Sequence, residues 1–574
     1  METAAPRPPR RREEAIVGWR LLRRYERSWL RPDLIAGLTV GAMLVPQSMA
    51  YAELAGVPPQ VGLYAVVLAP IAYALVGTSR HLGTGPEPGT AILAGTGVGA
   101  IIGTGGDVGR YLTLMAALAL LVAGIAAVAR LLRLGFVASL LSRPVLVGYI
   151  TGVGLVLVSS QLRSFTGVPV EAGEFFPRFG EFLTRLGQAQ GITVAVGVAA
   201  LATILLLRRY APRLPGALIA VGGATVVSYV LDLPGRGDPT VGAIPAGLPV
   251  PGLPAIGWTD LTALLPVALG ITLVGYTDNM LTARSIGARM GYRIDADQEF
   301  AGLAVANLAS GLMQGMPVSS SASRTAVPAA LGSVTTLVSI IASGLVIVTL
   351  LFARGVLGAV PRAALAAVIL AAAVAIIDVD GFRDLWHLSR TEFVLAAVTA
   401  LGVMVFDVLV GVLVAVALSV TVALARMARP EDAVLGARAD LDGWVAVDQH
   451  PAARTLPGLL VYRFDAPLFF INAERFRTRL IVLLEENPGP EEWVVLDFEG
   501  IGEIDATAID ALRELIDELA VEEVAVVAVA RANERTLARL QRAGLIAPTG
   551  PLVSFPTINA AVTAFEERAP RTDD

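Results

Sequence analysis

Arg324 is the only charged residue between Phe300 and Ala353, and it follows a cluster of serines at positions 319–323. A charge within such an apolar stretch is costly in a bilayer and normally faces a cavity or a binding site. Serines also cap helix starts, whose free N–H groups and positive dipole end favour an anion. The segment therefore predicts an anion-binding site inside a membrane. The alternative is an arginine at a helix end that extends its charge toward the membrane surface.

The rest of the chain fits a membrane setting. Hydrophobic residues make up 55% of the 574 residues and charged residues only 16%, with a mean hydropathy of +0.67. Soluble globular chains carry about 25% charged residues. Uncharged runs recur, and several reach the roughly 20 residues that span a bilayer, whereas shorter ones indicate half-spanning helices. We count about fourteen helical elements in this pattern.

Several function classes find no support in the sequence. The chain has no cysteine, and its three histidines (His81, His387 and His450) are far apart, so we expect no metal site and no cofactor. No nucleophile and base stand in a plausible catalytic arrangement, so we do not expect an enzyme. The net charge of −5 gives no indication of a nucleic-acid partner.

Arginines set the expected topology. Nine of them fall within residues 1–31, directly before the first apolar run, and this places the N-terminus in the cytoplasm. An even number of spans then places the C-terminus there as well. We therefore expect a multi-pass protein of the cytoplasmic (inner) membrane, in contact with membrane lipid.

Composition divides the chain into four parts. Residues 1–32 read as a cytoplasmic basic arm, residues 33–428 as the transmembrane domain and residues 429–455 as a polar linker. Residues 456–570 alternate apolar strand-like runs with helical stretches, which predicts a small α/β domain. It lacks a glycine-rich phosphate loop and a catalytic triad, so regulation or assembly is its expected role.

The membrane half contains two matched interruptions. Residues 77–90 (GTSRHLGTGPEPGT) and the serine–arginine segment each precede a short apolar run, and each is third in its set of about seven. Such paired breaks indicate the binding site of an inverted-repeat transporter. Asp278 and Thr282 lie one helical turn apart, and their oxygens suit a sodium ion or a proton. Pairing of Asp278 with Arg284 is the alternative.

These motifs resemble the SulP family of sulfate permeases and related anion exchangers over almost the full length. The resemblance rests on residues 33–40 (DLIAGLTV), 45–52 (VPQSMAYA), 62–64 (GLY), 77–80 (GTSR), 85–86 (GP), 297–299 (DQE), 306–307 (AN), 317–318 (PV) and 323–325 (SRT). The C-terminal part is similar to the STAS domain that usually follows, through residues 457–460 (PGLL) and 467–474 (PLFFINAE).

The resemblance implies an all-α polytopic domain of about fourteen helices, built as a seven-plus-seven inverted repeat with a core and a gate. It implies an anion held between the starts of the third and tenth helices, next to the first. Carried onto this sequence, the anion-binding residues are Gln47, Tyr51, Glu87, Pro88, Gly89, Ser321, Ala322, Ser323 and Arg324. The coupling-ion residues are Asp278 and Thr282.

Two departures leave the substrate open. Many members of the family have a small or apolar residue at Glu87, whose carboxylate would repel an anion unless protonated or paired with Arg324. Many members also have glutamate where this chain has Asp278. The Asp278–Thr282 pair resembles the sodium site of the family's bicarbonate transporters, but those transporters lack the Ser323-Arg324-Thr325 arginine.

The expected function is therefore secondary active transport of an inorganic anion by alternating access, coupled to a proton or sodium ion, with sulfate as the first candidate. The alternatives are a sodium-dependent bicarbonate or dicarboxylate transporter, an uncoupled anion channel, or a membrane sensor with a STAS output. We also expect a homodimer. Asp505 and Thr507 match a position that is phosphorylated in stand-alone STAS relatives, but Asp505 suits a helix N-cap better.

Overall fold

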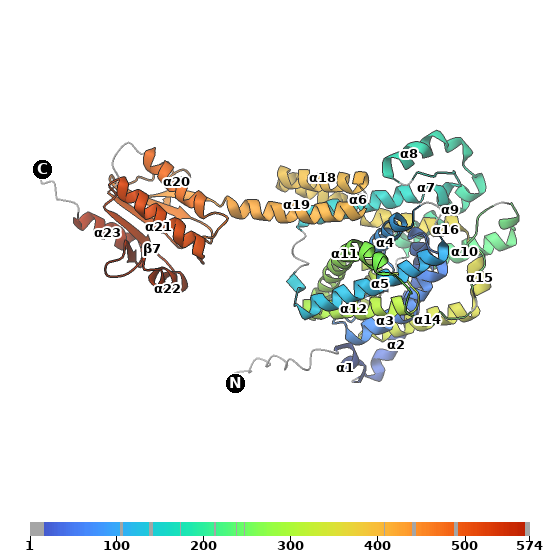
Figure 1. The fold of residues 1–574 in the computed structure, drawn as a ribbon. Helices are drawn as coiled ribbons and strands as arrows, with labels where there is room; N and C mark the ends of the chain where they lie inside the picture. The colour runs from blue at the N-terminus through green and yellow to red at the C-terminus, as the bar shows by residue number, and fades with distance from the viewer. Residues whose placement is uncertain are drawn as a thin grey trace. The chain divides into compact units, whose positions relative to one another are not determined.

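The computed structural model describes residues 17–23, 25–103, 107–136, 142–172, 174–211, 214–236, 238–245, 247–406, 408–438, 443–486 and 492–568. It divides into two compact units, Met1–Ser419 and Val420–Asp574 (Figure 1). The first sixteen residues of the predicted basic arm lie outside the described part. Among the described residues, seven helices are long and apolar enough to cross a membrane.

Residues 30–428 form two successive sets of membrane helices, and the last helix crosses the boundary between the two units. Shorter helices connect them. Within the described residues, the first set is α2 (Leu30–Leu54), α3 (Pro59–Val76), α4 (Pro88–Ile102), α5 (Val108–Leu131), α6 (Arg143–Ser160) continued by α7 (Leu162–Thr166), α9 (Gly191–Tyr210) and α10 (Gly216–Val230). The second is α11 (Trp258–Met290), α12 (Ala296–Leu312), α13 (Ala322–Ala330), α14 (Leu337–Phe352), α16 (Arg362–Ile376), α18 (Arg390–Phe406) and α19 (Val408–Ala428). The connecting helices are α1 (Val17–Arg23), α8 (Phe175–Thr184), α15 (Arg354–Gly358) and α17 (Val379–Leu388), with 3-10 turns at Arg27–Trp29, Leu186–Gln188 and Pro234–Arg236.

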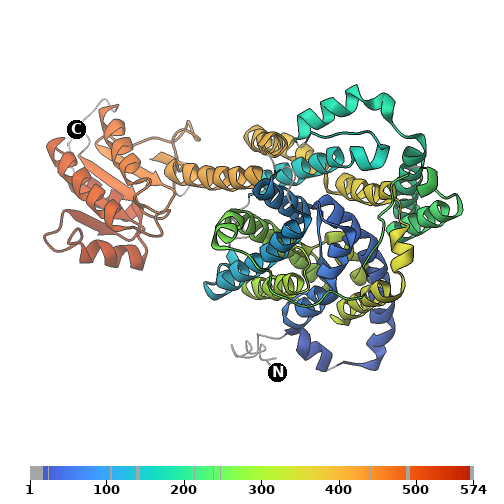
Figure 2. The ribbon, with the colours of Figure 1, turned by 45° about the vertical axis from the view of Figure 1, so that its right-hand side comes forward.

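Helix packing follows the predicted repeat. The contact between α5 and α12 corresponds to the contact between α14 and α3, when the fourth and second helices of each set are matched. In the same way, α6 packs against α18 as α16 packs against α9. The first four helices of each set pack together as one group, and the later helices form a second (Figure 2). The predicted all-α membrane fold is thereby confirmed.

The third helix of each set is too short to span. At 1.5 Å per residue, the 15-residue α4 is about 22 Å long and the 9-residue α13 about 14 Å, against roughly 30 Å of hydrocarbon. α4 starts with Glu87 as its N-cap and Pro88 in its first turn, where the missing proline N–H costs nothing. Both interruptions predicted from sequence therefore begin half-spanning helices.

The second unit is a six-stranded sheet flanked by helices. Its strand order is β4-β3-β5-β6-β7-β8, parallel from β5 to β8 and antiparallel at β3 and β4. Phe476, Leu512 and Leu540 of α20, α21 and α22 belong to one apolar cluster, and Phe565 of α23 belongs to another with Trp493. The elements are β3 (Asp432–Ala437), β4 (Trp444–Ala446), β5 (Leu459–Phe464), α20 (Ala473–Glu485), β6 (Trp493–Asp497), α21 (Ala506–Val521), β7 (Val526–Ala530), α22 (Glu534–Arg542), β8 (Leu552–Phe555) and α23 (Ile558–Arg568).

The predicted linker at 429–455 is wrong in part, because β3 and β4 lie within it. β3 pairs with β5 through Val434 and Tyr462, so this segment extends the sheet at its antiparallel edge. The domain therefore begins near residue 432 rather than 456. The predicted N-cap is confirmed: the Asp505 side chain accepts a hydrogen bond from the Ala508 N–H (2.8 Å), while Thr507 is exposed.

Candidate functional site

The two interrupted segments meet as a short β-ribbon. β1 (Thr84–Gly85) pairs antiparallel with β2 (Ser319–Ser320), just before α4 and α13 begin. The Ser321 N–H donates to the Gly83 carbonyl at 3.1 Å. Gly83 is required by packing, since a Cβ there would lie 2.6 Å from the Cβ of Arg324. The ribbon brings the N-termini of two half-helices together, where both dipoles favour negative charge.

Buried polar side chains hold β2 in place. Asn307 of α12 donates to the Val318 carbonyl (2.9 Å) and accepts from the Val318 N–H (2.9 Å). Ser319 donates to the carbonyl of Gly275 in α11 at 3.2 Å. Polar backbone at membrane depth is tolerated only where such groups satisfy it or where it lines a cavity.

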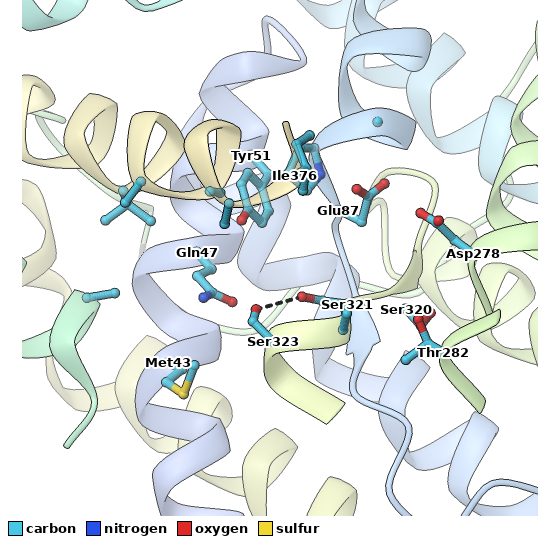
Figure 3. Close-up of a pocket in the computed structure, with 18 of the residues that line it drawn as sticks. Met43, Gln47, Tyr51, Glu87, Asp278, Thr282, Ser320, Ser321, Ser323 and Ile376 are labelled. Atoms are coloured by element: carbon cyan, nitrogen blue, oxygen red, sulfur yellow. Dashed lines mark hydrogen bonds between the residues drawn. The ribbon is translucent and has the colours of Figure 1, made fainter. Parts of the chain in front are cut away.

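A cavity of about 630 Å³ lies beside the ribbon (Figure 3). Its wall contains ten of the predicted site residues: Gln47 and Tyr51 from α2, Glu87, Pro88 and Gly89 at the start of α4, Ser321, Ala322 and Ser323 at the start of α13, and Asp278 and Thr282 from α11. Residues up to 276 positions apart in sequence thus share one wall, since the list runs from Gln47 to Ser323.

The lining has two chemically different sides. Gln47, Tyr51 and Ser323 lie together on one side, and the Ser321 and Ser323 hydroxyls are 3.0 Å apart. Amide and hydroxyl donors of this kind suit an anion. Glu87 and Asp278 lie on the other side, with their carboxylates turned toward each other (Figure 3). Carboxylate oxygens suit a proton or a cation.

Glu87 is buried and caps α4. Its Oε2 accepts from the Thr90 N–H at 3.0 Å, as expected of an N-cap residue. No ion pair joins Glu87 to Arg324 among the described residues, so the predicted pairing is not present. The Tyr149 hydroxyl from α6 is also buried on this wall and has no hydrogen-bond partner in the described part of the chain.

Arg324 does not line the cavity. Its side chain is 0% exposed, and its Nη1 donates to Gln47 Oε1 (3.2 Å) while its Nη2 donates to the Pro86 carbonyl (3.0 Å). The expected direct contact with an anion is therefore not supported, and the snorkelling alternative is excluded by full burial. The guanidinium instead fixes the Gln47 amide: with Oε1 engaged by a donor, the Nε2–H donors remain for the cavity.

Asp278 shares the cavity wall with Thr282 and Ser320 (Figure 3). Ser320 is 2% exposed, and its hydroxyl has no hydrogen-bond partner among the described residues. Asp278 forms no ion pair with Arg284 in that part of the chain. The Asp278 carboxylate turns toward Glu87, while the Thr282 and Ser320 side chains lie apart from it on the same wall. This side of the cavity is therefore rich in oxygen atoms, which suits a small cation or a proton.

Sequence reasoning missed three lining residues that carry polar groups. Tyr149 carried no motif, and Ser320 could not be told apart from its serine neighbours before the ribbon register was known. Arg208 of α9, which is exposed, directly follows an uncharged run, and nothing in the sequence related it to the other site residues. Its position on the wall could be recognised only from the packing of α9 against α16.

The fold and the site define a membrane transporter in which two half-helices face one another at the binding site. The chain matches the Sulfate permease family over residues 30–399 and the STAS domain over residues 450–557. It belongs to the sulfate permease (SulP) family, whose members are transporters and not enzymes.

Curated relatives and solved structures agree with this assignment. A probable sulfate transporter of Mycobacterium tuberculosis is 45% identical over 547 residues, covering 95% of this chain and 97% of the relative. A chloroplastic sulfate transporter of Arabidopsis thaliana is 29% identical, covering 95% and 81%. Murine solute carrier 26 family member A9, an anion transporter solved in an inward-facing state, shares the fold with a TM-score of 0.89 at 23% identity, covering 99% and 96%. The transmembrane domain of a cyanobacterial bicarbonate transporter matches with a TM-score of 0.58 at 22% identity, covering 69% and 98%.

Proposed function

We propose that the protein is a secondary active transporter of a small inorganic anion, with sulfate as the first candidate. The observation that carries the proposal is that one cavity has hydrogen-bond donors on one side and carboxylates on the other. The names of the relatives at 45% and 29% identity support sulfate. Bicarbonate, a dicarboxylate and uncoupled channel flux are the alternatives.

The anion is proposed to bind between the starts of α4 and α13, beside Gln47. The Gln47 amide, the Tyr51 hydroxyl and the Ser321 and Ser323 hydroxyls would donate hydrogen bonds to its oxygens. Two helix N-termini add positive potential at this point. Arg324 acts from behind the wall: it orients Gln47, and its charge attracts the anion across a low-dielectric layer.

The coupling ion is proposed to bind on the opposite side, at Asp278, Thr282 and Ser320. A proton needs only a carboxylate, whereas sodium needs several oxygens around it. A cation there lowers the cost of bringing an anion into the same cavity, so the two ligands should bind cooperatively. Proton and sodium both remain candidates for this site.

We further propose an inward-open cavity in a cytoplasmic-membrane protein. Arg208 lines the cavity and lies with Arg209 in the last turn of α9, and the positive-inside rule places such a basic helix end in the cytoplasm. Both termini would then be cytoplasmic. A homodimer and a regulatory role for the STAS domain, with Asp505 and Thr507 as candidate positions, complete the proposal.

Counterflow into proteoliposomes tests this function. Vesicles containing the full-length protein and loaded with unlabelled sulfate should accumulate labelled sulfate, and excess bicarbonate or dicarboxylate should compete poorly. Empty vesicles and a Gln47→Ala, Ser323→Ala double variant serve as controls. A channel would show no counterflow, and preferential accumulation of bicarbonate or dicarboxylate would replace sulfate with that substrate.

A further inference from the structure

Helix α8 exposes its apolar face, whereas a surface helix normally buries that face. Phe176, Phe179, Leu183 and Leu186 recur at the spacing of one helical face and continue into the following turn. Their side chains are 51%, 46%, 55% and 50% exposed, so this apolar face points away from the protein. Both ribbon views place α8 at the periphery of the membrane unit (Figures 1 and 2).

The polar face of α8 points toward the protein and is held by hydrogen bonds. Glu181 Oε2 accepts from the N–H groups of Ala172 (2.8 Å) and Glu171 (2.9 Å). These two donors hold the pKa of Glu181 below its usual range, so the carboxylate stays ionised near neutral pH. Arg185 donates a hydrogen bond to the Pro169 carbonyl (2.6 Å), and Arg178 donates one to the Ala172 carbonyl (3.1 Å).

We propose that α8 lies in the membrane interface, with its apolar face among the lipid acyl chains. It is joined to candidate spans on both sides, Arg143–Thr166 and Gly191–Tyr210, and therefore lies at the level where spans leave the bilayer. An amphipathic helix that lies in the plane of the membrane interface buries its apolar face at the boundary between headgroups and acyl chains, and its polar face points away from the acyl chains. In α8 the polar side chains form hydrogen bonds with the protein itself.

Lipid fits this face better than a second copy of the chain. Four half-exposed apolar side chains offer on the order of 400 Å², about half of what one partner contributes to a standard interface of ~800 Å² per side. The corresponding connection in the second set, α17, differs. α17 also exposes apolar side chains, but its Asp380 and Arg383 side chains are 94% and 71% exposed, so Asp380 serves as a charged, exposed reference position.

Spin labelling tests the proposal, because the chain contains no cysteine to remove. Phe179→Cys and Leu183→Cys replace exposed side chains, so folding should be retained. In proteoliposomes of phosphatidylcholine with phosphatidylglycerol, a nitroxide at either position should collide with oxygen more often than with a water-soluble nickel complex. Asp380→Cys in α17 should show the reverse preference.

Two outcomes would overturn the proposal. Labels at 179 and 183 that collide with the nickel complex as readily as the label at 380 would place α8 in water. Dipolar broadening that disappears on mixing with unlabelled protein would show that a second copy covers the face. Neither result depends on transport, so this test is separate from that of the proposed function.

Discussion

Buried carboxylates occur in two regions of the membrane unit and differ in how they are satisfied. Away from the cavity, Glu299 of α12 accepts from the Tyr73 hydroxyl (2.7 Å) and from the Thr78 N–H (2.9 Å) and hydroxyl. Asp33 accepts from the Val334 N–H (2.8 Å) and from the Thr335 hydroxyl. On the cavity wall, Glu87 accepts a hydrogen bond only from its own helix among the described residues, and Asp278 accepts none from that part of the chain.

This difference distinguishes carboxylates that stabilise the fold from carboxylates that are available to bind an ion. A buried carboxylate with several donors is stabilised as an anion and joins helices that are distant in sequence. A buried carboxylate that faces a cavity and lacks donors is stabilised only when a ligand or a proton arrives. We therefore expect changes at Glu299 to affect folding and changes at Asp278 to affect coupling.

Asp278→Asn should have the largest effect on transport. It removes the charge proposed to hold the coupling ion, so uptake driven by a sodium or proton gradient should fall by about 5- to 150-fold, the range of typical coupling energies. Uptake is measured in proteoliposomes against each gradient separately. Thr282→Val discriminates the ions: it should reduce sodium-driven uptake and leave proton-driven uptake intact. Unchanged gradient dependence in Asp278→Asn would make Asp278 a structural residue.

Arg324→Ala should weaken sulfate binding by roughly 30-fold, about 2 kcal/mol, because the Gln47 amide loses its fixed orientation together with the nearby charge. Arg324→Lys is the matched control, since lysine keeps the charge but not the two-pronged geometry. Binding is measured calorimetrically on purified protein. Full recovery by lysine would show that charge alone matters, and wild-type affinity in Arg324→Ala would contradict any role at the site.

Glu299→Ala should lower the stability of the membrane unit by about 3 kcal/mol, because it leaves the buried Tyr73 and Thr78 donors unsatisfied. Glu299→Gln retains an acceptor and should recover part of this loss. Thermal unfolding in detergent measures the effect. Sulfate affinity of the folded fraction should not change. A loss of affinity without a loss of stability would show that Glu299 contributes to ligand binding rather than to folding.

Arg208→Ala should have the smallest effect. An exposed cation on the cavity wall attracts the anion before it binds, so its removal should slow uptake about twofold at low ionic strength. The effect should vanish in high salt, where exposed charges are screened. Arg209→Ala is the neighbouring control, because Arg209 is not among the cavity-lining residues. A loss that persists at high salt would indicate direct contact with the anion.

Much of the fold followed from hydrophobic patterning. The uncharged runs gave the membrane helices, and the two Gly/Pro/Ser/Thr-rich breaks gave the half-helices α4 and α13, since few other residues interrupt an apolar stretch so sharply. β3 (DAVLGA) and β4 (WVA) were not predicted, because each is a very short apolar run within an otherwise polar segment. They are short strands at an antiparallel edge, and their pairing with β5 decides their structure.

The sequence predicted which residues line the cavity better than it predicted the directions of their side chains. Six of the ten residues on the cavity wall lie at the starts of α4 and α13, which were predicted to meet. The other four came from the family resemblance and from helical spacing. The direction of the Arg324 side chain depends on the rotation of α13 after the ribbon, and Gly83 and Gln47 set that rotation from distant segments. Ser320 likewise became distinct only once its register with Thr84 was known.

The central claim is that an anion and a coupling cation bind on opposite sides of one cavity and favour each other. The most direct test is the sulfate affinity of the purified full-length protein, titrated against sodium at fixed pH and against pH without sodium. We predict that wild-type affinity rises with sodium or with acidity, and that Asp278→Asn abolishes this rise. Affinity that is independent of both ions in the wild type, or a rise that survives in Asp278→Asn, would contradict the account.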